Sequence, residues 1–341
     1  MIRGVLEELL AGRELAGDTM EACFGALMGG EWSEPQQAAF LIALRAKGET
    51  AGEVAAAARV LRRLAVAVAT RRAPLIDTCG TGGDGSHTLN ISTGAALVAA
   101  ACGVAVAKHG NRSISSRCGS ADVMEALGVR VELEPEQLGD LLDRTGFAFL
   151  FAPRLHPAMR AVMPVRRALG VRTLFNLLGP LANPAGVSRQ VVGVYSADVQ
   201  PLVAKALATL GAEHAWVVHS ADGLDEISIG APTRVVEVRD GEVVGQFVVD
   251  PAELGVHPGG RAELAGGEAS ENAARLRAIL EGEERGAGAE AIALNAGAAL
   301  VIADRVRSLR EGVEEARVCL AAGGGAQKLA EVVRTAQEIH S

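Results

Sequence analysis

Apolar residues in the first seventy positions recur at helical spacing, and no strand-like run interrupts them. Three segments begin with a possible helix-capping side chain that is followed three positions later by a polar acceptor: Asp18 with Glu21, Ser33 with Gln36, and Thr50 with Glu53. This spacing satisfies free backbone N–H groups at the start of a helix. The pattern therefore predicts an all-helical N-terminal region.

The pattern changes after Thr70, where short apolar runs alternate with Ala-rich helical stretches. The strand-like runs are PLID, GVAVA, FAFLF, QVVGVY and AWVVH. Such alternation is typical of βαβ units on a largely parallel sheet. The Gly/Glu-rich stretch at 280–290 predicts a loop between two later helices.

Residues 158–183 return to helical spacing without a strand among them, so this insert can fold back onto the N-terminal helices. We predict an α/β fold with a small all-helical domain beside a larger α/β domain that has a mainly parallel central sheet. The small domain comprises 1–69 with 165–190, and the large domain comprises 70–164 with 191–341. Ligands are expected in the inter-domain cleft, where the carboxyl ends of strands converge.

Composition narrows the class of protein. The chain has 341 residues, 49% of them apolar, which is enough for one large or two ordinary domains with buried cores. The longest apolar runs are interrupted by Gly and end at charges, so no membrane span is expected. The N-terminus has acids within an amphipathic pattern, unlike a signal peptide. Five scattered cysteines without C-x-x-C spacing favour a reduced, cytoplasmic location.

The charge distribution points to a small ligand. A formal net charge of −8 argues against general affinity for nucleic acid. From Arg144 to Arg189, however, there are seven arginines and no Asp or Glu. This cationic stretch favours a small anionic ligand. The alternative is a solvated basic face, which would usually interleave acids.

Gly80, Gly82 and Gly85 in DTCGTGGDGSHTLNIST satisfy G-x-G-x-x-G, the dinucleotide fingerprint. That fingerprint also needs a preceding strand, a helix that starts among the glycines, and an acid about 20 residues later. The strand is predicted, but the next good helix cap is Ser92 or Thr93, and the second strand ends in Lys108 instead of an acid. NAD binding is therefore not favoured.

A phosphate cradle fits the same stretch better. Glycines let backbone N–H groups turn inward to form an anion nest. Asn90, Ser92 and Thr93 place side-chain donors and a helix N-terminus beside it. Lys108, on the adjacent strand, supplies a point charge. Asp84 would repel a bare phosphate, so its place here is explained by a contact with ribose hydroxyls or, through water, with a metal ion.

Four blocks of this sequence resemble the anthranilate phosphoribosyltransferase family, in order and over essentially the whole chain. They are GTGGDGSHTLNIST, AKHGNRSISSRCGSADVMEALG, HPAMRAVMPVRRALGVRTLFNLLGPLANPAG and DGLDEIS. The resemblance implies transfer of phosphoribose from phosphoribosyl pyrophosphate (PRPP) to anthranilate, in tryptophan biosynthesis. It also implies a small helical domain beside an α/β domain, and a homodimer joined through the helical domain.

The resemblance assigns residues to three kinds of site. For PRPP it implies Gly80, Thr81, Gly82, Gly83, Asp84, Thr88, Asn90, Ile91, Ser92, Thr93, Lys108, His109, Gly110, Asn111 and Ser120, with Lys108 acting electrostatically. For two Mg²⁺ ions per active site it implies Ser92, Asp225 and Glu226. For anthranilate it implies Gly80, His109, Asn111, Arg166, Gly179 and Pro180, with Arg166 gripping the carboxylate. No residue stands out as a strong general base.

Some neighbouring residues are given structural roles. Arg167 is expected to point away from its neighbour Arg166 on the same helix. Cys79 lacks a partner base and is expected to be a small buried residue behind the loop. His156 is expected to fix a helix start rather than contact a substrate.

Two other functions use the same scaffold. A pyrimidine nucleoside phosphorylase would use free phosphate and need no Mg²⁺ pair, so Asp225 and Glu226 argue against it. A non-catalytic nucleic-acid-binding relative would have a basic dimer surface and a degraded site, which the acidic charge and the intact motifs do not match.

Overall fold

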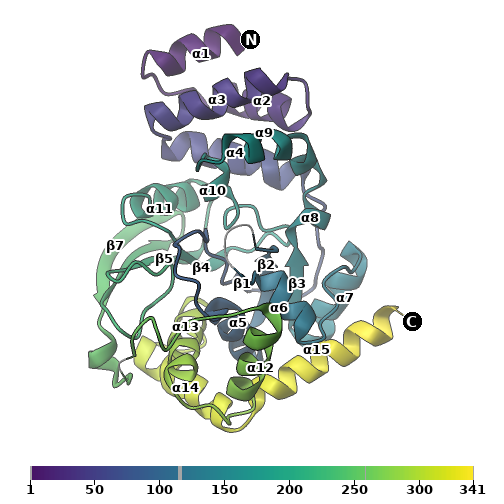
Figure 1. The fold of residues 1–341 in the computed structure, drawn as a ribbon, viewed down its shortest axis with the longest axis vertical. Helices are drawn as coiled ribbons and strands as arrows, with labels where there is room; N and C mark the ends of the chain where they lie inside the picture. Colours follow the sequence, from purple (N-terminus) through teal and green to yellow (C-terminus); the bar gives the residue numbers. More distant parts are fainter. Residues whose placement is uncertain (1, 114–116, 258, 341) are drawn as a thin grey trace.

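The computed structural model describes residues 2–113, 117–257 and 259–340. A helical part stands above a larger α/β part in Figure 1. The upper part contains α1 (Ile2–Leu10), α2 (Gly17–Met28), α3 (Glu34–Lys47), α4 (Ala51–Leu64), α9 (Met163–Leu169) and α10 (Phe175–Leu178). The predicted return of a later helical segment to the N-terminal helices is therefore seen in the structure.

Two of the three predicted helix caps are present. Gln36 accepts the Ser33 N–H at 3.0 Å, and Glu53 accepts the Thr50 N–H at 2.9 Å while the Thr50 hydroxyl accepts the Glu53 N–H. The predicted cap at Asp18 is wrong, because α2 begins at Gly17 and Asp18 lies within its first turn. An acid in that position faces the positive end of the helix dipole instead of capping the helix.

The lower part is built on one seven-stranded sheet with the order β3-β2-β1-β4-β5-β6-β7. Its strands are β1 (Leu75–Asp77), β2 (Ala105–Gly110), β3 (Phe147–Phe151), β4 (Arg189–Gly193), β5 (His214–Ser220), β6 (Thr233–Arg239) and β7 (Glu242–Val249). The first five are parallel, as the sequence predicts. Successive strands add outward from β1 on one side and from β4 on the other, so the strand order switches direction between β1 and β4.

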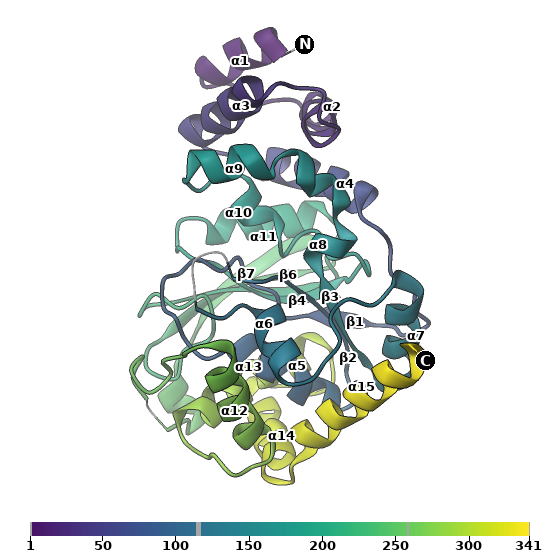
Figure 2. The same cartoon turned by 45° about the vertical axis from the view of Figure 1, so that its right-hand side comes forward.

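Helices cover both faces of the sheet (Figure 2). The remaining helices are α5 (Ile91–Ala101), α6 (Ser120–Ala126), α7 (Pro135–Thr145), α8 (Ala152–Leu155), α11 (Gln200–Thr209), α12 (Ala269–Leu280), α13 (Ala287–Ile302), α14 (Leu309–Ala321) and α15 (Gly324–His340), with 3₁₀ turns at Pro157–Ala161 and Pro251–Leu254. One apolar core joins α5, α13 and α15 to one face. A second core joins α11 and the upper helices to the other face.

The antiparallel pair β6–β7 is absent from the predicted strands. Its turn is Asp240–Gly241, and both residues have positive φ (50° and 78°). An Asp-Gly pair between strand-like runs is a strong hairpin signal, so the sequence does contain a signal for this hairpin.

Two predicted boundaries also differ. β2 continues past Lys108 to Gly110, because β3 pairs with it as far as Phe151. The predicted loop at 280–290 is shorter, since α12 ends at Leu280 and α13 begins at Ala287. No helix in the described ranges combines the length and apolar character needed to span a membrane.

Candidate active site

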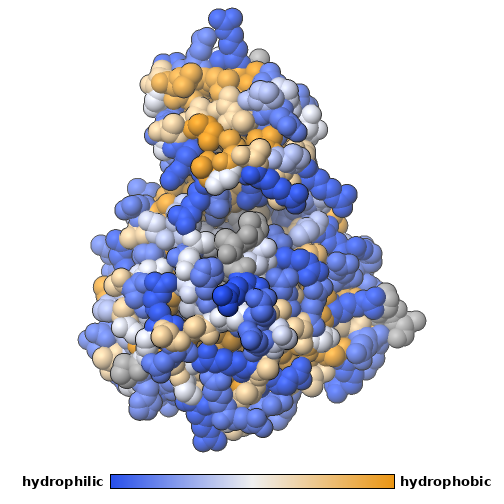
Figure 3. Space-filling model, viewed as in Figure 1, coloured by the Kyte–Doolittle hydropathy of each residue, from blue (hydrophilic) through white to orange (hydrophobic). Residues whose placement is uncertain are grey.

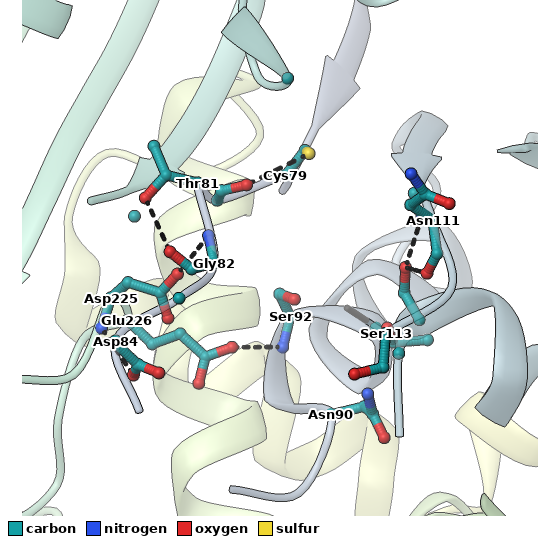
Figure 4. Close-up of a pocket in the computed structure, with 18 of the residues that line it drawn as sticks. Cys79, Thr81, Gly82, Asp84, Asn90, Ser92, Asn111, Ser113, Asp225 and Glu226 are labelled. Atoms are coloured by element: carbon teal, nitrogen blue, oxygen red, sulfur yellow. Dashed lines mark hydrogen bonds between the residues drawn. The ribbon is translucent and has the colours of Figure 1, made fainter. Parts of the chain in front are cut away.

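A cavity of about 890 Å³ lies between the upper helices and the carboxyl ends of the central strands. Loops after β1, β2 and β5 supply one side of its lining, and residues of α9 and the following segment supply the other. This is the switch point of the strand order, where open α/β sheets typically bind ligands. Figure 4 shows Asp84, Asp225 and Glu226 on one side of the cavity and Asn90 and Asn111 on the other.

The glycine loop that follows β1 is held by the loop that follows β5. The Gly82 N–H donates to Asp225 Oδ2 at 2.9 Å (Figure 4), and the Thr81 N–H donates to the Gly193 carbonyl at 2.8 Å. Gly82, Gly83 and Gly85 have φ of 63°, 77° and 71°, a conformation that side chains rarely tolerate. The glycines of the loop thus adopt the backbone conformation that a nest requires, and a carboxylate oxygen binds one of the loop N–H groups.

The N-terminus of α5 borders the same cavity. Asn90 is its N-cap residue without a side-chain cap bond, and the Ser92 N–H donates to Glu226 Oε1 at 2.9 Å. The buried Thr93 hydroxyl has no hydrogen-bond partner among the described residues. A helix N-terminus attracts anions through its dipole and free N–H groups. As in the glycine loop, a carboxylate binds one of those groups in this structure.

Asp84, Asp225 and Glu226 form an acidic cluster on this side of the cavity. Burial, and then the charge of Asp84, raises the pKa of Asp225 to about 7. Burial, and then the charge of Asp225, raises the pKa of Glu226 well above its usual value. A divalent cation would relieve this repulsion, since both causes disfavour negative charge.

The donor set of this cluster fits Mg²⁺. Its carboxylate oxygens and the nearby Ser92 hydroxyl are hard oxygen ligands. In the part of the chain that the structure describes, no group of three or more His, Cys, Asp or Glu side chains could hold a metal ion alone. Mg²⁺ commonly takes one or two carboxylates and completes its shell with water and substrate phosphates. The residues present therefore suit ions that arrive with a phosphorylated ligand.

Lys108 adds a buried cation to the floor of the cavity. Its side chain is almost fully buried and contacts Thr78 through the carbonyl at 3.4 Å and the hydroxyl at 3.3 Å. Beneath it, Asp77 accepts from the His109 N–H and the Asn183 amide. Burial raises the pKa of Asp77 to about 6, against the opposing effect of Lys108. The Lys108 ammonium therefore supplies positive charge in a water-poor setting, where it acts most strongly.

His109 links the end of β2 to Gly179, the residue that follows α10. Its Nδ1 lies 3.1 Å from the Gly179 carbonyl, so Nδ1–H is the donor and Nε2 carries the lone pair. Burial, followed by the nearby His156, lowers the pKa of His109 to about 3. The imidazole is thus neutral at physiological pH, and its Nε2 has no partner among the described residues.

Arg166 is a guanidinium on the opposite wall. It lies 4.9 Å above the Phe175 ring, and its Nη1 lies 3.9 Å from the Met163 sulfur. Burial lowers the pKa of Arg166, and the described residues provide it with no ion pair. A mostly buried cation without an anion is costly. This side chain therefore favours a ligand carboxylate, which the guanidinium fork can bind with two parallel hydrogen bonds.

Most of the predicted site residues line the cavity. They are Gly80, Thr81, Gly82, Gly83, Asp84, Thr88, Asn90, Ser92, Thr93, Lys108, His109, Gly110, Asn111, Ser120, Arg166, Gly179, Asp225 and Glu226. Ile91 and Pro180 are outside the lining. Ile91 belongs to the core under α5, and Pro180 is buried with its carbonyl bound by Gln190.

Several lining residues were not predicted. Arg167 lines the cavity, which differs from its expected orientation, and Arg112, Arg172 and Asn176 lie there too. The acid-free arginine stretch was the available signal for Arg167 and Arg172. His156 lies outside the lining, as expected, but its side chain makes no cap bond to the 3₁₀ turn that follows it. Its ring is buried, with its centroid 5.1 Å from that of His109. Cys79 is only partly buried and lines the cavity, so the expectation of a buried residue behind the loop is wrong, although burial of its thiol raises the Cys79 pKa.

Replacing Gly193 by alanine is expected to distort this site. A Cβ there would lie 1.4 Å from the Asp225 carbonyl oxygen, so the β5 loop or the end of β4 would have to move. We expect the free energy of unfolding in urea to fall by about 1–3 kcal/mol. Gly245→Ala is the control, because its Cβ would meet nothing within 4 Å. Equal effects of the two variants would contradict the close approach.

The fold and this cavity define a glycosyltransferase built from a helical bundle and an α/β domain. The family model for the helical bundle domain of glycosyl transferases matches residues 3–65, and the model for the α/β domain matches residues 72–326. A curated anthranilate phosphoribosyltransferase from Desulfatibacillum aliphaticivorans is 47% identical over 99% of each chain. The chain belongs to the anthranilate phosphoribosyltransferase family.

Solved structures agree with this assignment. The crystal structure of the anthranilate phosphoribosyltransferase from Thermus thermophilus has a TM-score of 0.92 at 47% identity, covering 98% of this chain and 99% of that one. The enzyme from Saccharomyces cerevisiae in complex with PRPP and Mg has a TM-score of 0.92 at 26% identity, and the match covers 99% of this chain and 98% of the yeast chain. The yeast enzyme is also solved with 4-fluoroanthranilate. These relatives do not favour the phosphorylase or the nucleic-acid-binding alternative.

Proposed function

We propose that this enzyme transfers the phosphoribosyl group of PRPP to the amine of anthranilate, giving N-(5-phosphoribosyl)anthranilate and pyrophosphate in tryptophan biosynthesis. One observation carries the proposal: a single cavity joins an anion nest and an acid pair to a mostly buried guanidinium without an ion pair. The first arrangement suits a metal-bound pyrophosphate, and the second suits the carboxylate of anthranilate. The names of the relatives support this pair of substrates.

The PRPP subsite is proposed around the glycine loop and the start of α5. Gly80 to Asp84 surround the pyrophosphate and ribose, and Thr88, Asn90, Ser92, Thr93, Lys108, Asn111 and Ser120 complete the shell. Lys108 acts as a fixed charge for the leaving group. The Asn111 N–H donates to the Ser120 hydroxyl at 3.2 Å, which keeps these two residues together. Ile91 contributes through its backbone, since its side chain is in the core.

Asp225, Glu226 and the Ser92 hydroxyl are proposed to hold Mg²⁺, with two ions per active site. When bound with PRPP, Mg²⁺ neutralises charge on the pyrophosphate. Asp225 accepts the Gly82 N–H, and Glu226 accepts the Ser92 N–H. The two acids therefore also have a role when no ligand is bound. They hold the loop and the helix start close to their ligand-binding positions.

The anthranilate subsite is proposed on the opposite wall. Arg166 grips the carboxylate, and Gly80, His109, Asn111 and Gly179 line the path towards the ribose. Pro180 would act from behind, because its carbonyl is bound by Gln190 at 2.7 Å. The neutral His109 adds no charge that would compete with Arg166 for the carboxylate.

The chemistry needs positioning and charge neutralisation more than proton abstraction. The bond from ribose C1 to the pyrophosphate oxygen breaks, the bond from C1 to the anthranilate nitrogen forms, and that nitrogen releases a proton to solvent water. The aromatic amine is already neutral, so no strong base is required to make it a nucleophile. The protein holds the amine near C1 and places Lys108 where negative charge grows on the leaving group.

Anthranilate fluorescence tests the proposed function directly. We expect purified protein to remove the fluorescence of anthranilate when PRPP and Mg²⁺ are both present, and to leave it unchanged when either is omitted or a chelator is added. Loss without PRPP would exclude the reaction. If folded protein gives no loss under any condition, thymidine with phosphate is the next substrate pair.

A homodimer joined through the helical part is also proposed. Figure 3 shows apolar residues gathered over the upper part of the molecule. Leu10 and Ile42 are exposed there, with 78% and 38% of their surface accessible. Light scattering of the purified protein would give twice the mass of the chain, and a monomer at micromolar concentration would exclude this assembly.

The two-domain division is kept as a proposal, with residues 1–69 and 165–190 in the helical domain and the remainder in the α/β domain. The core shared by α1–α4, α9 and α10 supports it, although α11 also packs against this core. A cytoplasmic location stays a prediction.

A further inference from the structure

Arg172 lies between an aromatic ring and the glycine loop. Its guanidinium carbon is 4.2 Å from the centroid of the Tyr195 ring, and its Nη2 donates to the Gly83 carbonyl. The side chain is largely exposed and lines the cavity. A guanidinium can stack on a ring and donate from its edge at the same time, so the two contacts are compatible.

These contacts join three parts of the chain. Arg172 belongs to the segment between α9 and α10, Gly83 is in the loop after β1, and Tyr195 follows β4. Tyr195 also holds the loop through its backbone, because its N–H donates to the Thr81 hydroxyl at 3.1 Å. The loop is therefore held at two points. Tyr195 bonds to Thr81, and Arg172, which stacks on Tyr195, bonds to Gly83.

Tyr195 also packs against the apolar core that the upper helices share with α11 and the sheet. Arg45 at the end of α3 and Glu49 just after it are close enough to influence the Tyr195 pKa, which burial raises. Because Arg172 comes from the later helical segment, its contacts with Tyr195 and Gly83 join that segment to the glycine loop. A movement of this segment relative to the sheet would therefore act on Gly83 through Arg172.

The bond to Gly83 affects the geometry of the nest. The C=O of a trans peptide and the next N–H point in opposite directions. Holding the Gly83 carbonyl towards Arg172 therefore fixes the direction of the Asp84 N–H, which points away from Arg172. Gly83 has a φ of 77°, so without such a bond its glycine backbone has several other conformations available.

We propose that Arg172 and Tyr195 form a latch that holds the glycine loop in its PRPP-binding shape and couples it to the helical part. Arg172 is then a positioning residue for PRPP, an assignment that rests on the proposed function. It differs from Arg166, whose guanidinium lies on Phe175 and is not bonded to the loop.

Kinetics of Arg172→Gln test the latch. We expect the KM for PRPP to rise at least tenfold, with kcat at saturating PRPP and the KM for anthranilate both changed less than threefold. Arg160→Gln is the matched control, since Arg160 is exposed and lies outside the cavity lining. A KM for PRPP that matches the control would overturn the proposal, as would equal increases for both substrates.

Tyr195 variants separate the latch from a simple loss of charge. Tyr195→Phe keeps the ring and should behave like the parent enzyme, whereas Tyr195→Leu should reproduce Arg172→Gln. The double variant, Tyr195→Leu with Arg172→Gln, should have a KM for PRPP no higher than either single variant, because both substitutions remove the same support. Fully additive effects would show that the two residues act independently and would exclude a latch.

Amide hydrogen exchange gives a readout that does not depend on catalysis. In substrate-free protein, peptides covering residues 80–88 should exchange faster in Arg172→Gln and Tyr195→Leu than in the parent, and at the parent rate in Arg160→Gln. Unchanged exchange in the first two variants would overturn the latch. If the parent enzyme shows no transfer, the proposed function fails while this exchange still tests the latch.

Discussion

Replacing Arg166 by alanine is expected to raise the KM for anthranilate ten- to hundredfold, equivalent to about 1.4–2.8 kcal/mol of lost binding. The guanidinium is mostly buried, and the described residues give it no anion, so a substrate carboxylate would be its main partner. The KM for PRPP should stay within about twofold, because Arg166 is on the wall opposite the glycine loop. Initial rates with each substrate varied in turn measure both constants.

Arg166→Lys is the matched variant, because it keeps the charge and removes the planar fork. We expect it to fall between the parent and Arg166→Ala, since an ammonium cannot bind a carboxylate with two parallel hydrogen bonds. Circular dichroism should show that both variants are folded, because the arginine stacks on Phe175 and its loss also removes packing. Equal increases in both KM values would remove Arg166 from the carboxylate role.

The repeating parts of the fold could be predicted from local pattern. Helical spacing with the Ser33 and Thr50 caps predicts α3 and α4, and the apolar runs predict the five parallel strands. Both signals are local, since a cap satisfies N–H groups within its own turn and a buried parallel strand is apolar throughout. Apolar runs do not predict the hairpin β6–β7, because its sequence signal is the Asp240–Gly241 turn between the two strands.

The candidate site could be predicted as a set of residues but not as a geometry. The bond from Gly82 to Asp225 joins positions 143 residues apart in sequence, and that from Ser92 to Glu226 joins positions 134 apart. No local spacing encodes such a contact. It depends on β4 lying between β1 and β5, and on Gly193 allowing the Asp225 backbone to approach.

Neighbouring positions of one motif also have different roles, which a motif alone does not separate. Ile91 and Pro180 were predicted as site residues, yet one packs in the core and the other is bound by Gln190. Arg172, which was not predicted as a site residue, contacts the loop directly. The adjacent residues Arg166 and Arg167 both line the cavity, and so does Arg172, whereas Arg160 does not, so only the packed structure shows which of the arginines face it.

Replacing Glu226 by glutamine is expected to raise the Mg²⁺ concentration for half-maximal activity at least tenfold, which corresponds to about 1.4 kcal/mol. Glutamine has nearly the shape of glutamate and can still accept the Ser92 N–H, so the start of α5 should stay in place. What is lost is a negatively charged oxygen ligand, the type that Mg²⁺ prefers. Rates measured at fixed PRPP across a Mg²⁺ series give the half-saturation point.

Asp222→Asn provides the control within the same loop. Asp222 accepts the Ser228 hydroxyl at 2.7 Å and lies outside the cavity lining, and an asparagine oxygen can accept that bond as well. This variant removes one negative charge four residues from Glu226 without removing a proposed ligand. If the two variants raise the Mg²⁺ concentration for half-maximal activity equally, the increase is caused by the lost negative charge of the loop and not by a lost metal ligand. If Glu226→Gln leaves the series unchanged, Glu226 does not hold the metal, and its role is to bind the N-terminus of α5.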